Sequence, residues 1–98
     1  MSMNKEKKVE LKIQLEEEVA QGTYTNLVFV NHNETEFTLD FIYVQPQQPK
    51  AKVHSRVISS PKHTKRLMLA LQENMRRWEE RFGEVDVSGI DPAGHVLQ

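Results

Sequence analysis

The sequence predicts an α+β fold, a four-stranded antiparallel meander followed by one long C-terminal helix. Four short segments with strand-like apolar patterns lie between residues 9 and 59, and polar or proline-containing turn sequences separate them. An apolar stripe at helical spacing follows over residues 61–82. Short links between consecutive strands favour antiparallel neighbours, which is why we expect a meander.

The first three predicted strands cover residues 9–16, 24–31 and 36–44. The first has one apolar face, because polar residues alternate with Val9, Leu11, Ile13 and Leu15. The other two are apolar on both faces, as in strands that are covered on each side. Residues 31–34 (NHNE) are typical of a turn and should join the second and third strands into a hairpin.

The fourth predicted strand covers residues 50–59 and follows a loop, QPQQP at residues 45–49. The loop should be exposed, because proline cannot donate a hydrogen bond to a strand ladder. Strict alternation would place Ala51, Val53, Ser55 and Val57 on one face of the strand and its basic side chains on the other, namely Lys52, His54 and Arg56.

The helix is expected to begin at Pro61, with Ser60 as its N-cap. Proline suits the first helical position because its missing N–H would have no partner there. The helix should run to about Phe82 and stop at Gly83 in the left-handed α conformation. One apolar stripe is defined by Leu67, Met68, Leu71, Met75, Trp78 and Phe82.

Ninety-eight residues are enough for one domain. We expect a flexible N-terminal segment at residues 1–8, a single domain at residues 9–83 and a flexible C-terminal tail at residues 84–98. No run of apolar residues is long enough to span a membrane and the N-terminus lacks the apolar core of a signal peptide, so a cytoplasmic location is expected. The absence of cysteine excludes disulfides, a thiolate zinc site and a cysteine nucleophile.

The predicted sheet has two faces with apolar side chains, and we expect the helix to cover only one of them. Leaving four or five large apolar side chains in water would forfeit several kcal/mol, at about 25 cal/mol per Å², which is comparable with the stability of a small domain. We therefore expect a homodimer, formed by sheet packing or by exchange of helices. Its interface is predicted at Leu27, Phe29, Ile42 and Val44. The alternative is a strongly curled sheet that wraps around its own helix.

Charge is distributed unevenly along the chain. The net charge is −1, but residues 41–72 contain no Asp or Glu and six Lys or Arg, which leaves 7 basic and 14 acidic residues elsewhere. Basic side chains also crowd the predicted helix start, where the partial positive charge of the helix disfavours them. An anion bound there by free N–H groups, by hydroxyl groups and by the basic side chains would remove the conflict. The candidate anion or nucleic-acid binding residues are Lys50, Lys52, His54, Arg56, Ser60, Lys62, His63, Lys65 and Arg66.

Two alternatives need no bound anion. Lysines on an exposed strand edge discourage aggregation between sheets, and long side chains at a helix start can bend into solvent.

The sequence contains no motif of a known enzyme class, so no catalytic residue is expected. The four histidines do not show metal-ligand spacing, and we expect neither a metal nor a cofactor. They are His32, His54, His63 and His95. Asp40 lies mid-strand among apolar residues, where it could pair locally or have a perturbed pKa.

From about Gly22 to Gly83 the chain resembles a small bacterial family known only as domain of unknown function 3467. The resemblance rests on Asn26, Leu39, Asp40, Phe41, Ser55, Arg56, Ser60, Pro61, His63, Lys65, Arg66, Leu67 and residues 80–83 (ERFG). It implies no activity. Four strands followed by a helix and paired as a dimer are also similar, in topology alone, to the transcriptional-coactivator and Whirly-type binders of single-stranded DNA.

That second similarity implies that basic residues such as Lys50, Lys52, Arg56 and Arg66 follow a phosphate backbone, with Tyr24, Phe29 or Tyr43 as stacking rings.

The leading hypothesis is a non-enzymatic, dimeric binding module whose basic strand-to-helix surface contacts an anionic partner. One alternative is a single-stranded nucleic-acid-binding protein. Another is a structural adaptor for protein–protein interaction that uses the acidic residues 16–18 or the tail. The expected partners are thus a second copy, single-stranded nucleic acid or an acidic protein, and not a membrane.

Overall fold

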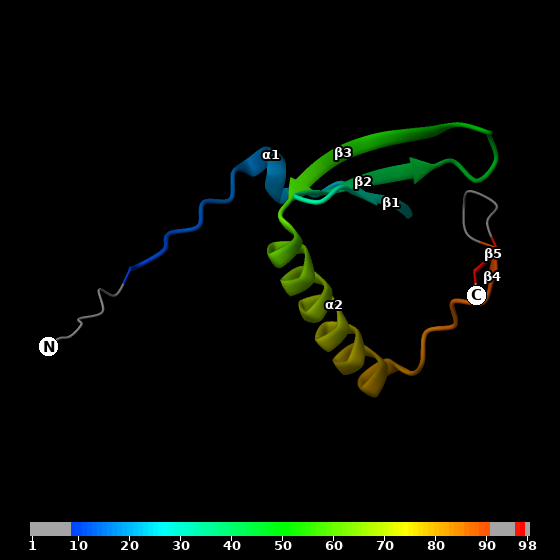
Figure 1. The fold of residues 1–98 in the computed structure, drawn as a ribbon. Coiled ribbons are helices and arrows are strands. Elements are labelled where there is room, and N and C mark those ends of the chain that lie inside the picture. Colours follow the sequence, from blue (N-terminus) through cyan, green and yellow to red (C-terminus); the bar gives the residue numbers. More distant parts are fainter. Residues whose placement is uncertain (1–8, 91–95, 98) are drawn as a thin grey trace, which may run out of the picture.

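The computed structural model describes residues 9–90, 96 and 97, which form a three-stranded sheet, one long helix and two shorter features (Figure 1). The elements in chain order are α1 (Glu17–Ala20), β1 (Leu27–His32), β2 (Phe37–Val44), β3 (Ala51–Ser59), α2 (Pro61–Phe82), β4 (Gly89–Ile90) and β5 (Val96–Leu97). The sheet has the order β1-β2-β3 with antiparallel neighbours. The predicted antiparallel sheet followed by a C-terminal helix is therefore confirmed.

The prediction of a fourth strand over residues 9–16 is wrong. This segment belongs to no strand, and its apolar side chains are among the most exposed of the described chain, with Val9 at 82% and Ile13 at 84%. The helical turn α1 and Gly22, with a φ of 77°, lie between this segment and β1. The segment points away from the sheet (Figure 1). Alternation shows which face of a strand would be buried, but a strand also needs a neighbouring edge to pair with.

Side-chain hydrogen bonds fix both ends of the β1–β2 pair. At the turn, Oδ1 of Asn33 accepts hydrogen bonds of 2.9 Å from the backbone N–H groups of Thr35 and Glu36. This turn lies slightly later than predicted, because β1 continues to His32. At the other end, the side chain of Asn26 donates to the carbonyl oxygen of Val44 and accepts from its N–H. Asn26 thus extends the pairing beyond the last residues of the ladder.

A β-bulge in β3 changes the face on which its side chains lie. Phe41 pairs with Ser55 but Ile42 pairs with Val53, so His54 is an extra residue in the ladder. The expected alternation over the whole strand is therefore wrong. Lys52 lies opposite Tyr43 on one face of the sheet, whereas Arg56 lies opposite Asp40 on the other.

The bulge also separates Ala51 and Val53 from Ser55 and Val57, which were expected on one face.

The connection between β3 and α2 is a single residue, Ser60. Its backbone is extended, with φ −72° and ψ 160°, and its Oγ accepts a hydrogen bond from the N–H of His63. The predicted cap, first residue and extent of the helix are confirmed. The left-handed α conformation expected for Gly83 is wrong: its φ is 104° but its ψ is 162°, an extended geometry that glycine adopts because it has no Cβ.

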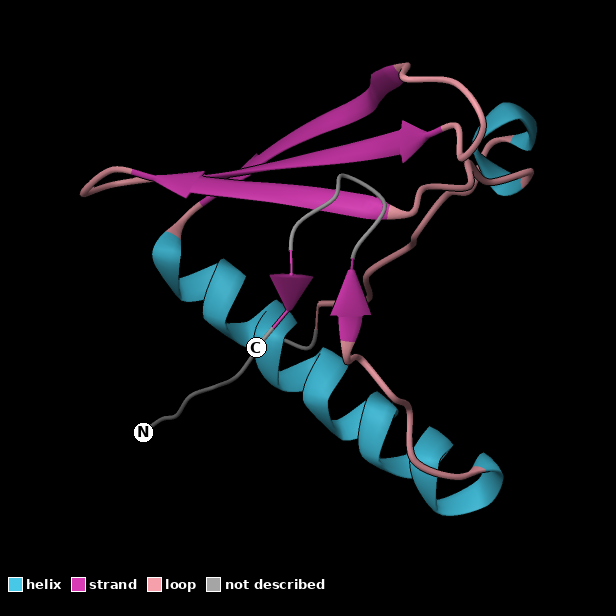
Figure 2. Cartoon of the chain, turned by 90° about the vertical axis from the view of Figure 1, so that its right-hand side faces the viewer, coloured by secondary structure: helices cyan, strands magenta, loops and turns pink. Residues whose placement is uncertain are grey.

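Little of the described chain is buried. Leu39 and Ile42 are its buried apolar residues, at 8% and 4% exposure, and Asp40 is also buried. No residue of α2 is buried, because the helix leaves the end of β3 at an angle and runs away from the sheet (Figures 1 and 2). The expectation that the helix covers one face of the sheet is therefore wrong. The Cα radius of gyration of 18.2 Å exceeds the value of about 13 Å for a compact domain of this length.

The C-terminal segment contains a feature that the sequence did not predict. Strands β4 and β5 pair antiparallel, Gly89 with Leu97 and Ile90 with Val96. Residues 1–8, 91–95 and 98 lie outside the described part of the chain, so flexibility of the two ends stays a prediction.

We predict that Ile42→Ala lowers the free energy of unfolding by about 2–5 kcal/mol, because it removes a large side chain from the small core. Urea unfolding at a fixed protein concentration measures the loss. The matched control is Ile13→Ala, at an exposed position, which should change stability by about 0.5 kcal/mol or less. A comparable loss in the control would show that residues 9–16 pack against the domain.

Candidate anion-binding site

The tip of the β2–β3 hairpin brings three of the predicted binding residues together. Lys50, Lys52 and His54 line an open hollow of about 610 Å³. The other lining residues are Tyr43, Gln45, Pro49 and Ala51. None of the described residues that line this hollow carries a carboxylate, so within the described part of the chain its lysines face no competing negative charge. We name Lys50, Lys52 and His54 the hairpin-tip group.

Aromatic rings lie beside the hairpin-tip group. The ring of Tyr43 is 6.1 Å from that of Tyr24, edge to face, and 6.2 Å from that of His54, measured between centroids. Tyr24 is 75% exposed. Phe29, the third ring considered for stacking, lies opposite Asp40 and therefore on the other face of the sheet.

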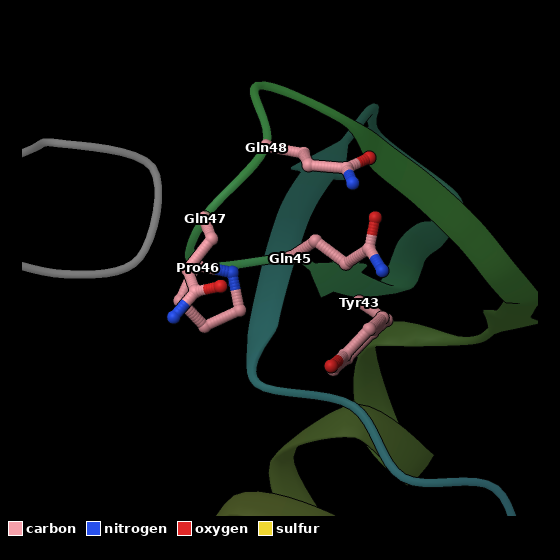
Figure 3. Close-up of a pocket in the computed structure, with 5 residues that line it drawn as sticks. All are labelled: Tyr43, Gln45, Pro46, Gln47 and Gln48. Atoms are coloured by element: carbon pink, nitrogen blue, oxygen red, sulfur yellow. The ribbon is translucent and has the colours of Figure 1, made fainter.

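The loop beside this hollow supplies neutral polar groups. A neighbouring pocket of about 220 Å³ is lined by Tyr43, Gln45, Pro46, Gln47 and Gln48. Figure 3 shows the side chains of Gln45 and Gln48 extending in the same direction, with the Tyr43 ring below Gln45 in this view. The loop itself is held by a hydrogen bond of 3.1 Å from the N–H of Gln45 to the carbonyl oxygen of Lys50. Amide and hydroxyl groups therefore lie next to the cationic hollow.

Arg56 is separated from the hairpin-tip group and has an internal partner. Its Nε and Nη2 donate to the two carboxylate oxygens of Asp40 at 2.7 and 2.9 Å, a bidentate ion pair. These hydrogen bonds lower the pKa of Asp40 although burial of the carboxyl group opposes the shift. The prediction that Asp40 pairs locally is confirmed. The pair neutralises much of the charge that Arg56 was expected to offer an anion.

The start of α2 holds the remaining basic candidates. Lys62, His63, Lys65 and Arg66 are exposed there, and we name them the helix-start group. The hydroxyl groups beside them already have partners: Oγ of Ser60 accepts from the N–H of His63, and Oγ1 of Thr64 donates to the carbonyl oxygen of Ser60. Ser60 lies eight positions after Lys52 along the extended chain, a distance of about 26 Å at roughly 3.3 Å per residue. The structure thus divides the candidates into two groups at opposite ends of β3.

The four residues of the predicted dimer interface lie together. A hollow of about 290 Å³ is lined by Leu27, Phe29, Ile42 and Val44 together with Pro49, Lys50 and Ala51. Leu27 and Ile42 are direct neighbours in the β1–β2 register. The sequence therefore identified one continuous face of the sheet, opposite to the face that carries Tyr43.

Sequence reasoning missed the grouping of Tyr24, Tyr43 and His54. It depends on the bulge, which turns His54 to the Tyr43 face, and no signal in the sequence located that bulge.

Metal-binding side-chain clusters and membrane-spanning helices are both absent from residues 9–90, 96 and 97. No group of three or more His, Cys, Asp or Glu side chains in this part could hold a metal ion. No helix in it has the length and apolar character that crossing a membrane requires. His95 lies outside the described residues, and the prediction that the protein uses no metal stays a prediction.

The geometry defines an α+β domain with a three-stranded antiparallel meander, a projecting helix and a basic hairpin tip. A family model described as "Protein of unknown function (DUF3467)" matches residues 1–87, and the chain belongs to this family. No curated protein and no solved structure matches the chain. The similarity to the Whirly-type topology stays a prediction, and the sheet departs from that topology in having three strands.

We predict that Asp40→Asn removes part of the acid sensitivity of the fold. A lowered pKa in the folded state means that the ionised carboxylate stabilises the fold above its ordinary pKa of about 3.9 and that this contribution is lost as the pH falls toward the lowered value. Thermal unfolding between pH 2 and pH 7 should therefore show a smaller loss on acidification in the variant, together with lower stability at pH 7.

Glu73 provides the internal reference for this measurement. Its pKa is lowered to about 2 by hydrogen bonds from Arg76 and Arg77, so some acid dependence persists in Asp40→Asn. An unchanged pH profile in the variant would contradict the role of the Asp40–Arg56 pair.

Proposed function

We propose that the chain is a non-enzymatic, homodimeric binding module that presents basic side chains of β3 and of the start of α2 to an anionic partner. The observation that carries this proposal is the hairpin-tip group, in which Lys50, Lys52 and His54 line one hollow and none of the described lining residues carries a carboxylate. A concave site lined by positive charges concentrates anions and favours their binding.

The homodimer is supported by how little the described chain buries. The helix α2 has no buried residue, and Trp78 and Phe82 are 48% and 60% exposed. Apolar surface of this extent stabilises association when a second molecule covers it. A second copy is the simplest source, because it offers the same surfaces in a self-complementary arrangement.

A single-stranded nucleic acid is the anionic partner favoured by the rings at the hairpin tip. Tyr43 lines the hollow with Lys50 and Lys52, and its ring contacts that of Tyr24. Proteins that bind single strands combine stacking rings with cations that follow the phosphate backbone. The helix-start group, about 26 Å further along β3, could extend the same track. An acidic protein segment would use the cations but not the rings. A cytoplasmic location belongs to this proposal, supported by a sequence without cysteine.

Fluorescence anisotropy with a labelled oligothymidine at two salt concentrations tests the proposal. We expect binding at low salt that weakens steeply as salt rises, because cations on DNA are released when lysines replace them. Lys52→Glu should weaken binding about tenfold and reduce the salt slope by about 0.7, the value for one phosphate contact on a single strand.

The matched control is Lys12→Glu, which makes the same charge change at an exposed position away from the hairpin tip. It should leave affinity within about twofold of the original protein. A polyglutamate peptide of similar charge distinguishes the partners: binding of the peptide without the oligonucleotide rejects the nucleic-acid version, and binding of neither overturns the proposal. Equal effects of the two variants would overturn the placement of the site at the hairpin tip.

A further inference from the structure

One face of α2 has the residue spacing of a coiled coil. Successive residues of this face are alternately four and three positions apart from Thr64 to Phe82, which is the spacing of the a and d positions of a heptad repeat. The residues are Thr64, Met68, Leu71, Met75, Trp78 and Phe82. All except Thr64 are exposed, and Leu71 is 61% exposed. The face is therefore built for another helix, which the described chain does not supply.

The sheet of the same chain is held away from this face. Ser60 alone connects β3 to α2, and its carbonyl oxygen accepts both the N–H and the Oγ1 hydroxyl of Thr64 while its own Oγ accepts the N–H of His63. Pro61 further restricts the backbone. The helix meets the sheet near its start, where Phe37 lines a hollow with Pro61, Thr64, Lys65 and Met68. Folding α2 flat onto its own sheet would break this capped junction.

We infer that α2 pairs in antiparallel orientation with α2 of a second copy, an inference that rests on the homodimer of the proposed function and specifies its interface. Antiparallel pairing places a positions opposite d positions. In one register the smallest residue of the face meets a large one, Thr64 against the partner's Phe82. Met68 then meets the partner's Trp78 and Leu71 meets the partner's Met75, so each layer has a similar volume.

Charges beside the apolar face favour the same register. Lys65, Gln72 and Glu79 each follow a d position and form one edge of the face. Antiparallel pairing brings this edge against its own copy, so Lys65 lies near the partner's Glu79, twice by symmetry, and Gln72 lies near the partner's Gln72. Glu79 can take part, because its Oε2 accepts the N–H of Val85 while its Oε1 has no hydrogen-bond partner among the described residues. Parallel pairing would instead stack Trp78 on Trp78 and bring no opposite charges together.

The charged residues on the outer side of α2 are compatible with antiparallel pairing, because they lie away from the seam between the helices. Glu73, Arg76, Arg77 and Glu80 form ion pairs of 2.8 to 3.2 Å with one another at heptad positions that face away from the seam. Three members of the helix-start group, Lys62, His63 and Arg66, also occupy outward positions, whereas Lys65 belongs to the interface. The pair therefore leaves Lys62, His63 and Arg66 accessible to an anion.

Sedimentation velocity of the full chain across micromolar concentrations tests the pairing through three variants. Lys65→Glu should raise the dimer dissociation constant about tenfold, because both symmetric contacts become repulsive. The charge exchange Lys65→Glu with Glu79→Lys should restore the original value within about twofold. Lys62→Glu, the same charge change at an outward position, should leave it unchanged. Circular dichroism monitors whether each variant keeps its fold.

A distance measurement distinguishes the orientations. The chain has no cysteine, so Lys62→Cys carries a nitroxide label at one site. Antiparallel pairing in the inferred register separates the two labelled residues by about 33 Å along the helix axis, at roughly 1.5 Å per residue, whereas parallel pairing brings them side by side.

The outcomes separate this inference from the proposed function. A short label distance, or a dimer in which Lys65→Glu and Lys62→Glu behave alike, overturns the helix pairing and leaves a dimer built on another face, such as the face with Leu27 and Ile42. A chain that stays monomeric at all these concentrations overturns both the pairing and the homodimer. Anion binding is measured separately, by the anisotropy experiment.

Discussion

The one-residue connection between β3 and α2 determines how much of its own surface this chain can cover. Ser60 directly follows strand β3 and is also the N-cap of α2. Its carbonyl oxygen and its hydroxyl group accept three hydrogen bonds from His63 and Thr64, which fix this geometry. The helix consequently begins at the edge of the sheet and runs away from it (Figure 2). Within the described part of the chain, both faces of the sheet and the apolar face of the helix stay largely uncovered, and exposed apolar surface of this kind favours association.

Within the sheet, polar contacts hold the middle strand β2 to its neighbours, because few apolar side chains are buried there. Asp40 and Arg56 join β2 to β3 through two hydrogen bonds, and Asn26 joins the chain before β1 to the end of β2. These residues and Ser60 are among those that carry the resemblance to the family. Their contacts serve the architecture, so membership of the family describes how the chain folds. The residues proposed to bind an anion at the hairpin tip, Lys50 and Lys52, lie outside that set.

The sequence predicted some elements well and others poorly for identifiable reasons. The helix bounds were predictable because Ser60, Pro61 and Gly83 act locally, through a cap, a preset φ and a positive φ. The failure of residues 9–16 to form a strand was not predictable, because alternation is a property of one segment whereas strand pairing requires two segments. The basic candidates were found by composition alone. Their division into the hairpin-tip and helix-start groups depended on the length of β3. Arg56 joins neither group because it forms an ion pair with Asp40.

By itself the sequence determined the class of fold, the helix with its ends, the two hairpins, and the sheet face that gathers Leu27, Phe29, Ile42 and Val44. All of these follow from periodicity and turn chemistry, which act over a few neighbouring residues. Only the tertiary structure decided that His54 bulges toward Tyr43, that Arg56 turns to Asp40, and that α2 does not cover the sheet. These outcomes depend on ladder register and on the direction of one short connection, and neither is encoded in the spacing of residues along the chain.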